Sequence, residues 1–139
     1  MFAVRAASAV LFGAVGVVAL TMAWRALTAK RLLPFHQAAT GRPWTELSTG
    51  QQSVATALTR SLGLGFFAAG LALLVACVTD VAHQDVATYG LAAIALVFCA
   101  GLALINRRLH LDTSVGTPWK QSLYAVAAII VAVALYGIA

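Results

Sequence analysis

The fold is decided by an uncharged run of 19 residues, SLGLGFFAAGLALLVACVT at positions 61–79. Three further runs without a charged side chain are 19 to 21 residues long and occupy positions 6–24, 86–106 and 121–139. An α-helix of about 20 apolar residues crosses the roughly 30 Å of bilayer hydrocarbon. The sequence therefore predicts membrane-spanning helices over about 4–26, 49–79, 86–107 and 118–138.

The composition indicates that lipid covers most of the surface of the folded chain. Of its 139 residues, 62% are hydrophobic and 9% are charged, which leaves too little polar surface for a soluble domain of this size. A β-barrel would need segments of about ten residues with alternating character, whereas the apolar runs here are continuous. We expect an all-α, integral membrane four-helix bundle that forms a single transmembrane domain over 1–139.

The distribution of charge predicts the orientation of the helices. Two connections, 27–48 and 108–117, hold or adjoin eight basic residues, whereas the 80–85 turn contains two aspartates and no basic residue. Short loops rich in Lys and Arg stay in the cytoplasm. We therefore expect two cytoplasmic loops, an external turn at 80–85 and both termini outside. The three tryptophans fall at the predicted inner boundary, where indole rings are common: Trp24, Trp44 and Trp119.

Local signals predict where two of the helices begin. Ser48 and Gln51 have the spacing of a capping box, in which each residue satisfies a backbone N–H of the other. Before the last helix, Thr117 is expected to be the cap and Pro118 the first helical residue.

The two cytoplasmic connections share a sequence pattern. Residues 36–44 read HQAATGRPW and residues 110–119 read HLDTSVGTPW. Each begins with His and ends with Gly-x-Pro-Trp before a membrane helix. One interpretation is two parallel helix-loop-helix repeats related by an axis along the membrane normal. The other is that Gly, Pro and Trp are common wherever a chain enters a membrane helix, and both interpretations stay open.

The first connection carries a resemblance to a known group of proteins. Leu33-Pro34-Phe35-His36, followed by Trp44-Thr45-Glu46-Leu47, resembles a loop motif of small, uncharacterised bacterial membrane proteins with four helices. The resemblance covers positions 33–47. It implies a bacterial inner (plasma) membrane location, and it implies no catalytic residue because these proteins have no established activity.

Small residues recur at every fourth position of the second predicted helix. Such a stripe lets the backbone of another helix approach closely. We expect it to pack within the chain, with a homo-oligomer contact as the alternative. The stripe consists of Ala57, Ser61, Gly65 and Ala69.

Candidate chemistry is confined to the cytoplasmic loops, because the four uncharged runs contain no Asp, Glu, Lys, Arg or His. Transporters and channels often use an ionisable residue within the membrane, so the absence of one makes transport the less favoured function. The loop histidines lack the spacing of a compact metal motif, so we expect no metal and no cofactor. A polar cluster on this face remains a candidate without an assigned catalytic residue, and we do not expect an enzyme. It comprises His36, Trp44, Glu46, His110 and Asp112.

The basic residues near the inner membrane boundary favour an anionic lipid. Each cation close to an anionic surface contributes about 1 kcal/mol of attraction. Nucleic acid is excluded because these residues flank apolar runs and form no stripe with interleaved aromatic residues. The predicted lipid or anion site comprises Arg42, Arg60, Arg107, Arg108, Trp119 and Lys120.

We therefore expect a non-catalytic binding or scaffold subunit that contacts anionic lipid or a partner protein at its cytoplasmic face. The alternatives are a small oligomeric transporter or channel and, third, a lipid-modifying enzyme at the membrane surface. The partner is a membrane lipid, a second copy of the chain or another membrane subunit. The substrate, the partner's identity and the oligomeric state are not encoded in any motif of the sequence.

Overall fold

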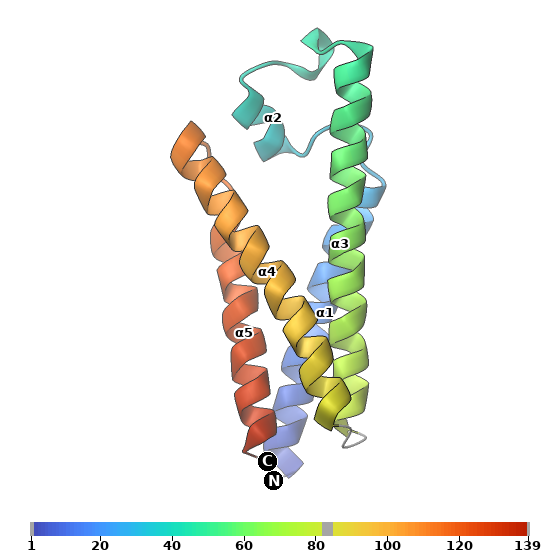
Figure 1. Cartoon of the computed structure of the whole chain (residues 1–139), viewed down its shortest axis with the longest axis vertical. Helices are drawn as coiled ribbons and strands as arrows, with labels where there is room; N and C mark the ends of the chain where they lie inside the picture. Colours follow the sequence, from blue (N-terminus) through green and yellow to red (C-terminus); the bar gives the residue numbers. More distant parts are fainter. Residues whose placement is uncertain (1, 82–84, 139) are drawn as a thin grey trace.

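The computed structural model describes residues 2–81 and 85–138, with only the backbone at 80 and 81. Residues 82–84 of the predicted 80–85 turn, including His83, therefore lie outside the described residues, whereas 80, 81 and 85 are helical. The described chain contains helices and no strand, which confirms the all-α prediction (Figure 1). Its elements are α1 (Phe2–Leu27), α2 (Pro34–Thr40), the 3-10 turn η1 (Trp44–Glu46), α3 (Thr49–Val81), α4 (Asp85–Thr113) and α5 (Trp119–Gly137).

The four long helices form a ring in the order α1, α3, α4, α5, in which α5 returns to contact α1. Figure 1 shows both termini at one end of the molecule, and α2 together with the α4–α5 connection at the other. We call these the termini end and the loop end. Helices α3 and α4 lie together near the termini end and diverge toward the loop end. The adjacent termini agree with an even number of membrane crossings.

All four long helices are long and apolar enough to cross a membrane. Large apolar side chains face outward on them; Val97 is 74% exposed and Ile105 is 68% exposed. Water would disfavour so large an exposed apolar surface, whereas lipid tails accept it. The chain is therefore built as a multi-pass membrane protein.

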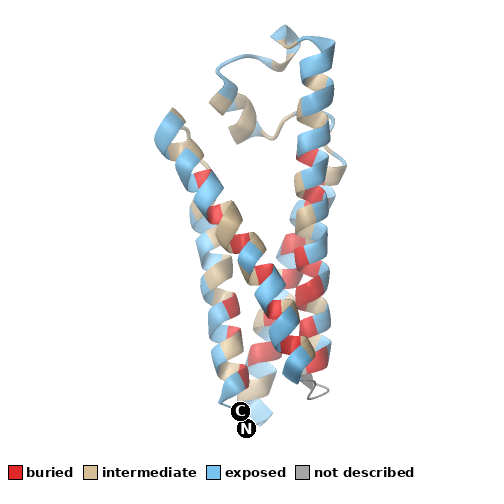
Figure 2. Ribbon diagram, viewed as in Figure 1, coloured by how far each residue is buried: buried red, intermediate tan, exposed pale blue. Residues whose placement is uncertain are grey.

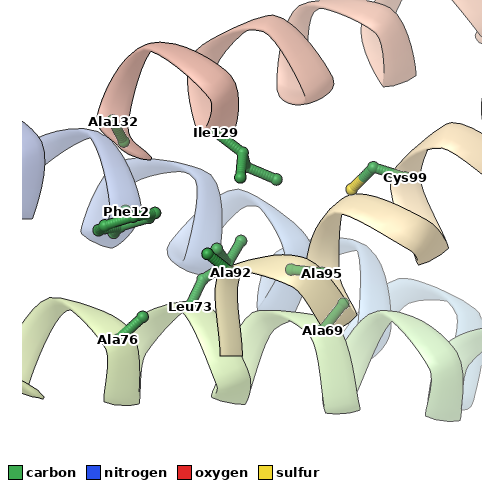
Figure 3. Close-up of a cluster of buried hydrophobic side chains, with 9 residues drawn as sticks. All are labelled: Phe12, Ala69, Leu73, Ala76, Ala92, Ala95, Cys99, Ile129 and Ala132. Carbon is green, nitrogen blue, oxygen red and sulfur yellow. The ribbon is translucent and has the colours of Figure 1, made fainter. Parts of the chain in front are cut away.

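The core is made mainly of small side chains, and buried positions gather toward the termini end (Figure 2). Alanines from α3, α4 and α5 surround a few larger residues, which lets the four helices approach closely (Figure 3). The cluster contains Phe12, Ala69, Leu73, Ala76, Ala92, Ala95, Cys99, Ile129 and Ala132.

Helices α1 and α3 touch through their backbones at two glycines. A Cβ added to Gly16 would lie 3.1 Å from the carbonyl oxygen of Gly70, and a Cβ added to Gly70 would lie 3.0 Å from the carbonyl oxygen of Gly16. Because neither backbone can yield easily, no larger residue fits at either position without moving a helix. This contact fixes the spacing of the α1–α3 pair.

The predicted small-residue stripe on α3 is divided between residues packed within the chain and exposed residues, and the exposed ones leave the homo-oligomer alternative open. Ala69 is buried and Gly65 packs against the Phe98 ring, but Ala57 and Ser61 are exposed. Gly63 lies level with the last residue of α1, so Ala57 is beyond the end of that helix. Ser61 is two residues from buried Gly63, which places it about 200° around the helix and away from α1.

The predicted helix boundaries need two corrections at the loop end. Helix α4 continues to Thr113, six residues past the predicted end at 107, so much of the predicted 108–117 loop is helical. The predicted 27–48 loop contains α2 and η1. Hydropathy marks where a helix leaves hydrocarbon, whereas the helix itself continues as long as its backbone hydrogen bonds can form.

The capping box of α3 is confirmed. The backbone N–H of Gln51 donates to Ser48 Oγ at 3.3 Å, and the backbone N–H of Ser48 donates to Gln51 Oε1 at 3.0 Å. The predicted Thr117 cap is wrong, because its hydroxyl donates to the backbone carbonyl of Asn106 at 2.7 Å. Helix α5 then begins at Trp119, one residue later than predicted, with Pro118 as its N-cap.

The two similar loop sequences also share a local conformation. Each ends a helix at a residue with positive φ, Gly41 at 64° and Ser114 at 56°. Each then reaches a helical element through Pro-Trp. In the first copy, however, Trp44 opens η1 and not a membrane helix, because α3 starts separately at its own capping box. The repeat remains a prediction that this local likeness favours.

Candidate functional site

The loop end presents the cations of the chain to its surroundings. Eight of the nine Lys and Arg residues belong to this end, and all eight are exposed. The ninth, Arg5, is at the termini end, where its guanidinium carbon lies 5.3 Å from the centre of the Tyr136 ring. Exposed cations at one end are available to an external anion, and they are Arg25, Lys30, Arg31, Arg42, Arg60, Arg107, Arg108 and Lys120.

The structure gathers four of the six predicted lipid-site residues on the α4–α5 arm. The bond from the Thr117 hydroxyl to the Asn106 carbonyl places the end of α4 beside the start of α5. Arg107 and Arg108 follow Asn106 directly, and Trp119 and Lys120 follow Thr117 within three residues. Lys120 Nζ lies 5.7 Å from the centre of the Trp119 ring, so an aromatic face and three cations share this arm.

One carboxylate partly offsets this positive surface. Arg108 Nε lies 3.8 Å from Asp112 Oδ2, and both side chains are largely exposed. An exposed ion pair one helical turn apart contributes little free energy, so an anionic ligand can replace it. Arg107 and Lys120 form no ion pair with a residue that the structure describes.

The remaining two predicted site residues lie on a different arm. Arg42 is in the connection between α2 and η1, and Arg60 is on α3. Because α3 and the end of α4 lie clearly apart in Figure 1, Arg60 does not form one cradle with Arg107 and Arg108. The predicted site is thus divided between two arms of the loop end.

The five residues of the predicted polar cluster are divided in the same way. His36, Trp44 and Glu46 belong to the first connection, whereas His110 and Asp112 belong to α4. No hydrogen bond or ion pair joins the two sets within the described ranges, so the structure does not assemble them. That these loops bind no metal stays a prediction.

His36 and His110 each have a local environment of their own. His110 Nδ1 lies 2.8 Å from the carbonyl oxygen of Val115, and since a carbonyl only accepts, Nδ1 carries the hydrogen in this bond. The bond fastens the α4–α5 connection. His36 lies half-buried with its ring centre 4.0 Å from that of Phe35. Burial lowers the pKa of His36 and so favours its neutral imidazole.

The sequence reasoning missed a buried amide at the loop end. Asn106 is 4% exposed, and its side chain forms no hydrogen bond with the residues that the structure describes. A buried amide without a partner costs about 1–3 kcal/mol. The available signal was a single Asn inside an otherwise apolar run, which a search for charged residues passes over.

The sequence reasoning also missed a polar cluster that joins all four long helices at the termini end. The Tyr136 hydroxyl donates to the Asp85 carboxylate, linking α5 to α4. The Tyr89 and Tyr136 rings meet edge to face with centres 5.3 Å apart. We call this group the termini-end cluster, and it comprises Arg5, Ser8, Thr79, Asp85, Thr88, Tyr89 and Tyr136.

Hydroxyl groups complete the termini-end cluster. The Ser8 hydroxyl of α1 donates to the carbonyl oxygen of Ala132 in α5 at 2.9 Å. The Thr88 hydroxyl of α4 donates to Thr79 Oγ1 of α3 at 2.9 Å, and Thr79 donates to the Ala76 carbonyl oxygen at 3.1 Å. These bonds act where water is scarce, so the cluster holds the four helices together.

The geometry therefore separates a bonded termini end from a loop end with accessible positive charge. Exposed cations and an interfacial tryptophan can bind a phosphate or carboxylate group by charge-assisted hydrogen bonds. No protein-family model, curated protein or solved structure matches this chain.

Proposed function

We propose that the chain is a non-catalytic binding or scaffold subunit whose loop end engages anionic lipid headgroups. The observation that carries the proposal is the unequal placement of charge: eight exposed cations lie at the loop end, and Arg5 alone lies at the termini end. By the positive-inside rule, the loop end then faces the cytoplasm and both termini lie outside. A bacterial inner membrane, suggested by the loop motif, fits this orientation and supplies anionic lipid on the cytoplasmic leaflet.

The α4–α5 arm is the strongest lipid-binding surface in this proposal. Arg107, Arg108 and Lys120 are exposed, and Trp119 suits the depth of the headgroups. Guanidinium groups can bind phosphate through paired N–H donors, which makes them stronger phosphate ligands than isolated amines. The Arg42 and Arg60 arm supplies a second, separate contact with the same leaflet.

Native mass spectrometry of the protein released from lipid nanodiscs tests this proposal. We expect the wild-type chain to retain phosphatidylglycerol in preference to phosphatidylcholine. A variant carrying R107Q and R108Q should lose roughly 30-fold in affinity, because two contacts of about 1 kcal/mol each are removed. Retention equal to that of the wild-type chain would contradict the proposal.

A matched variant separates charge from geometry. The R107K and R108K pair preserves both charges but removes the planar guanidinium groups. We expect this variant to retain most of the lipid preference, because both positive charges remain at the membrane surface. Reconstituted protein should also give no solute flux in proteoliposomes, since flux would favour the transporter alternative.

A further inference from the structure

The connection that leaves α1 lines an open hollow on the surface, separate from the α4–α5 arm. The hollow has a volume of about 620 Å³ and is lined by residues 29–34, Gln37 and Trp44. Sites for small molecules commonly have volumes of 300–1,000 Å³. The hollow is therefore large enough for a lipid headgroup with its glycerol carbons.

The walls of the hollow are held from two helices. Thr28 N–H donates to the Trp24 carbonyl at 3.0 Å, which continues the last turn of α1 to the rim of the hollow. On the other side, Gln52 Nε2 of α3 donates to the backbone carbonyls of Trp44 at 3.0 Å and Leu47 at 3.2 Å. These bonds fix the wall that carries Trp44.

The hollow lies at the depth expected for lipid headgroups. Its lining begins two residues after Leu27, where the membrane-spanning helix α1 ends. Trp24, one turn earlier, is 71% exposed and suits the membrane boundary. A ligand in the hollow would therefore sit where the bilayer changes from hydrocarbon to headgroups.

The lining combines positive charge with apolar surface. Lys30 and Arg31 are exposed, the lining contains no acidic residue, and neither cation forms an ion pair with a described residue. Leu32, Leu33 and Pro34 supply the apolar part of the wall. This combination fits a group that is anionic at one point and carbon-rich beside it.

We propose that this hollow binds a phosphate group, with Lys30 and Arg31 as its cationic ligands, Gln37 as an amide donor and Trp44 as the adjoining wall. A phosphate accepts several charge-assisted hydrogen bonds, which matches an ammonium, a guanidinium and an amide. The source is either a lipid headgroup or a soluble phosphate. The inference rests on the membrane placement in the proposed function, but it uses residues outside the α4–α5 arm.

The experiment uses Trp44 as its reporter. The protein carrying W24F and W119F is placed in nanodiscs of phosphatidylcholine, a lipid whose headgroup has no net charge. Short-chain phosphatidic acid and inorganic phosphate are titrated separately while Trp44 fluorescence is recorded. We expect a saturable change, and the arm that saturates at the lower phosphate concentration identifies the source.

A charge-removing and a charge-preserving variant give the decisive comparison. On this background, K30Q with R31Q should weaken the Trp44 response at least tenfold, whereas K30R with R31K, which keeps both charges, should leave it within about twofold. Circular dichroism checks that both variants retain their helices. The proposal is overturned if neither ligand changes Trp44 emission, or if the two variants weaken the response equally.

The result is distinguishable from failure of the proposed function. Lipid retention by the R107Q and R108Q variant reports on the α4–α5 arm, whereas Trp44 emission reports on the hollow. An unchanged Trp44 response in K30Q with R31Q would contradict the phosphate site in the hollow. The proposed lipid binding by the α4–α5 arm would then still be decided by native mass spectrometry alone.

Discussion

The two ends of the bundle use their polar residues in opposite ways. At the termini end, Tyr136 is buried, bonded to Asp85 and covered by Arg5, so polar groups there satisfy one another. At the loop end, α3 and α4 diverge and eight cations are exposed. The difference teaches that the contacts which hold the helices together are separate from the surface that can meet a ligand. Substitutions at the two ends should accordingly affect different properties.

Removal of the central aromatic residue of the termini end should have the largest effect. Tyr136→Ala deletes a buried ring together with its hydroxyl bond to Asp85, and we expect unfolding to become easier by about 4 kcal/mol. Titration with a denaturing detergent, followed by circular dichroism, measures the change. Tyr124→Ala on the same helix is the matched control, because Tyr124 is 70% exposed and should matter little to helix association. Equal losses in the two variants would remove the distinction between the ends.

The next largest effect is expected where α1 and α3 touch. Gly70→Leu places a side chain against the backbone of Gly16 and should destabilise the bundle by about 2 kcal/mol. Gly101→Leu on α4 is the control, since an added Cβ at Gly101 meets nothing within 4 Å. The same unfolding assay compares them. A Gly70→Leu variant as stable as Gly101→Leu would show that the backbones of α1 and α3 are not in contact at Gly16 and Gly70.

Two substitutions at one contact of the loop end should have opposite signs. Asn106→Leu removes a buried amide without a partner among the described residues and should stabilise the protein by about 1 kcal/mol. Thr117→Val removes the hydroxyl bond to the Asn106 carbonyl and should destabilise it by about 1 kcal/mol. Detergent unfolding of both variants supplies the test. If Asn106→Leu instead loses stability, the amide has a partner in the membrane, and the loop end is more tightly bonded than its ribbon suggests.

The smallest effect concerns the attachment of α2. Burial lowers the pKa of His36 below its value in a released segment, which is about 6.5. The released segment therefore binds more protons as the pH falls from about 6.5 through the lowered pKa, so acid weakens the packing of α2. The protection factors of residues 34–40 against hydrogen exchange, which correct for the slower intrinsic exchange in acid, should be smaller at pH 5.5 than at pH 7.5. His36→Gln should abolish this difference, whereas His110→Gln should retain it.

More of the fold than of the site could be predicted from the sequence, because hydropathy, charge and helix caps are patterns of residues close together in the chain. The four helices follow from uncharged runs such as 61–79, and the α3 cap follows from Ser48 and Gln51, which are only three residues apart. The bond between Ser8 and Ala132 joins positions 124 residues apart and depends on the rotation of two helices, which no local pattern specifies. The division of the predicted lipid site has the same origin, because the divergence of α3 and α4 depends on packing between helices. Asn106 was not identified from the sequence because an uncharged amide does not interrupt a charge-free run.

The bond from the Ser8 hydroxyl to Ala132 has a consequence for biosynthesis. A ribosome makes α1 first and Ala132 more than a hundred residues later, so the acceptor of this bond does not yet exist when α1 enters the bilayer. During that interval, the hydroxyl must find a carbonyl within its own helix, as serines in membrane helices commonly do. The final position of α1 is therefore reached only after α5 has been made, and the ring of helices closes at that point.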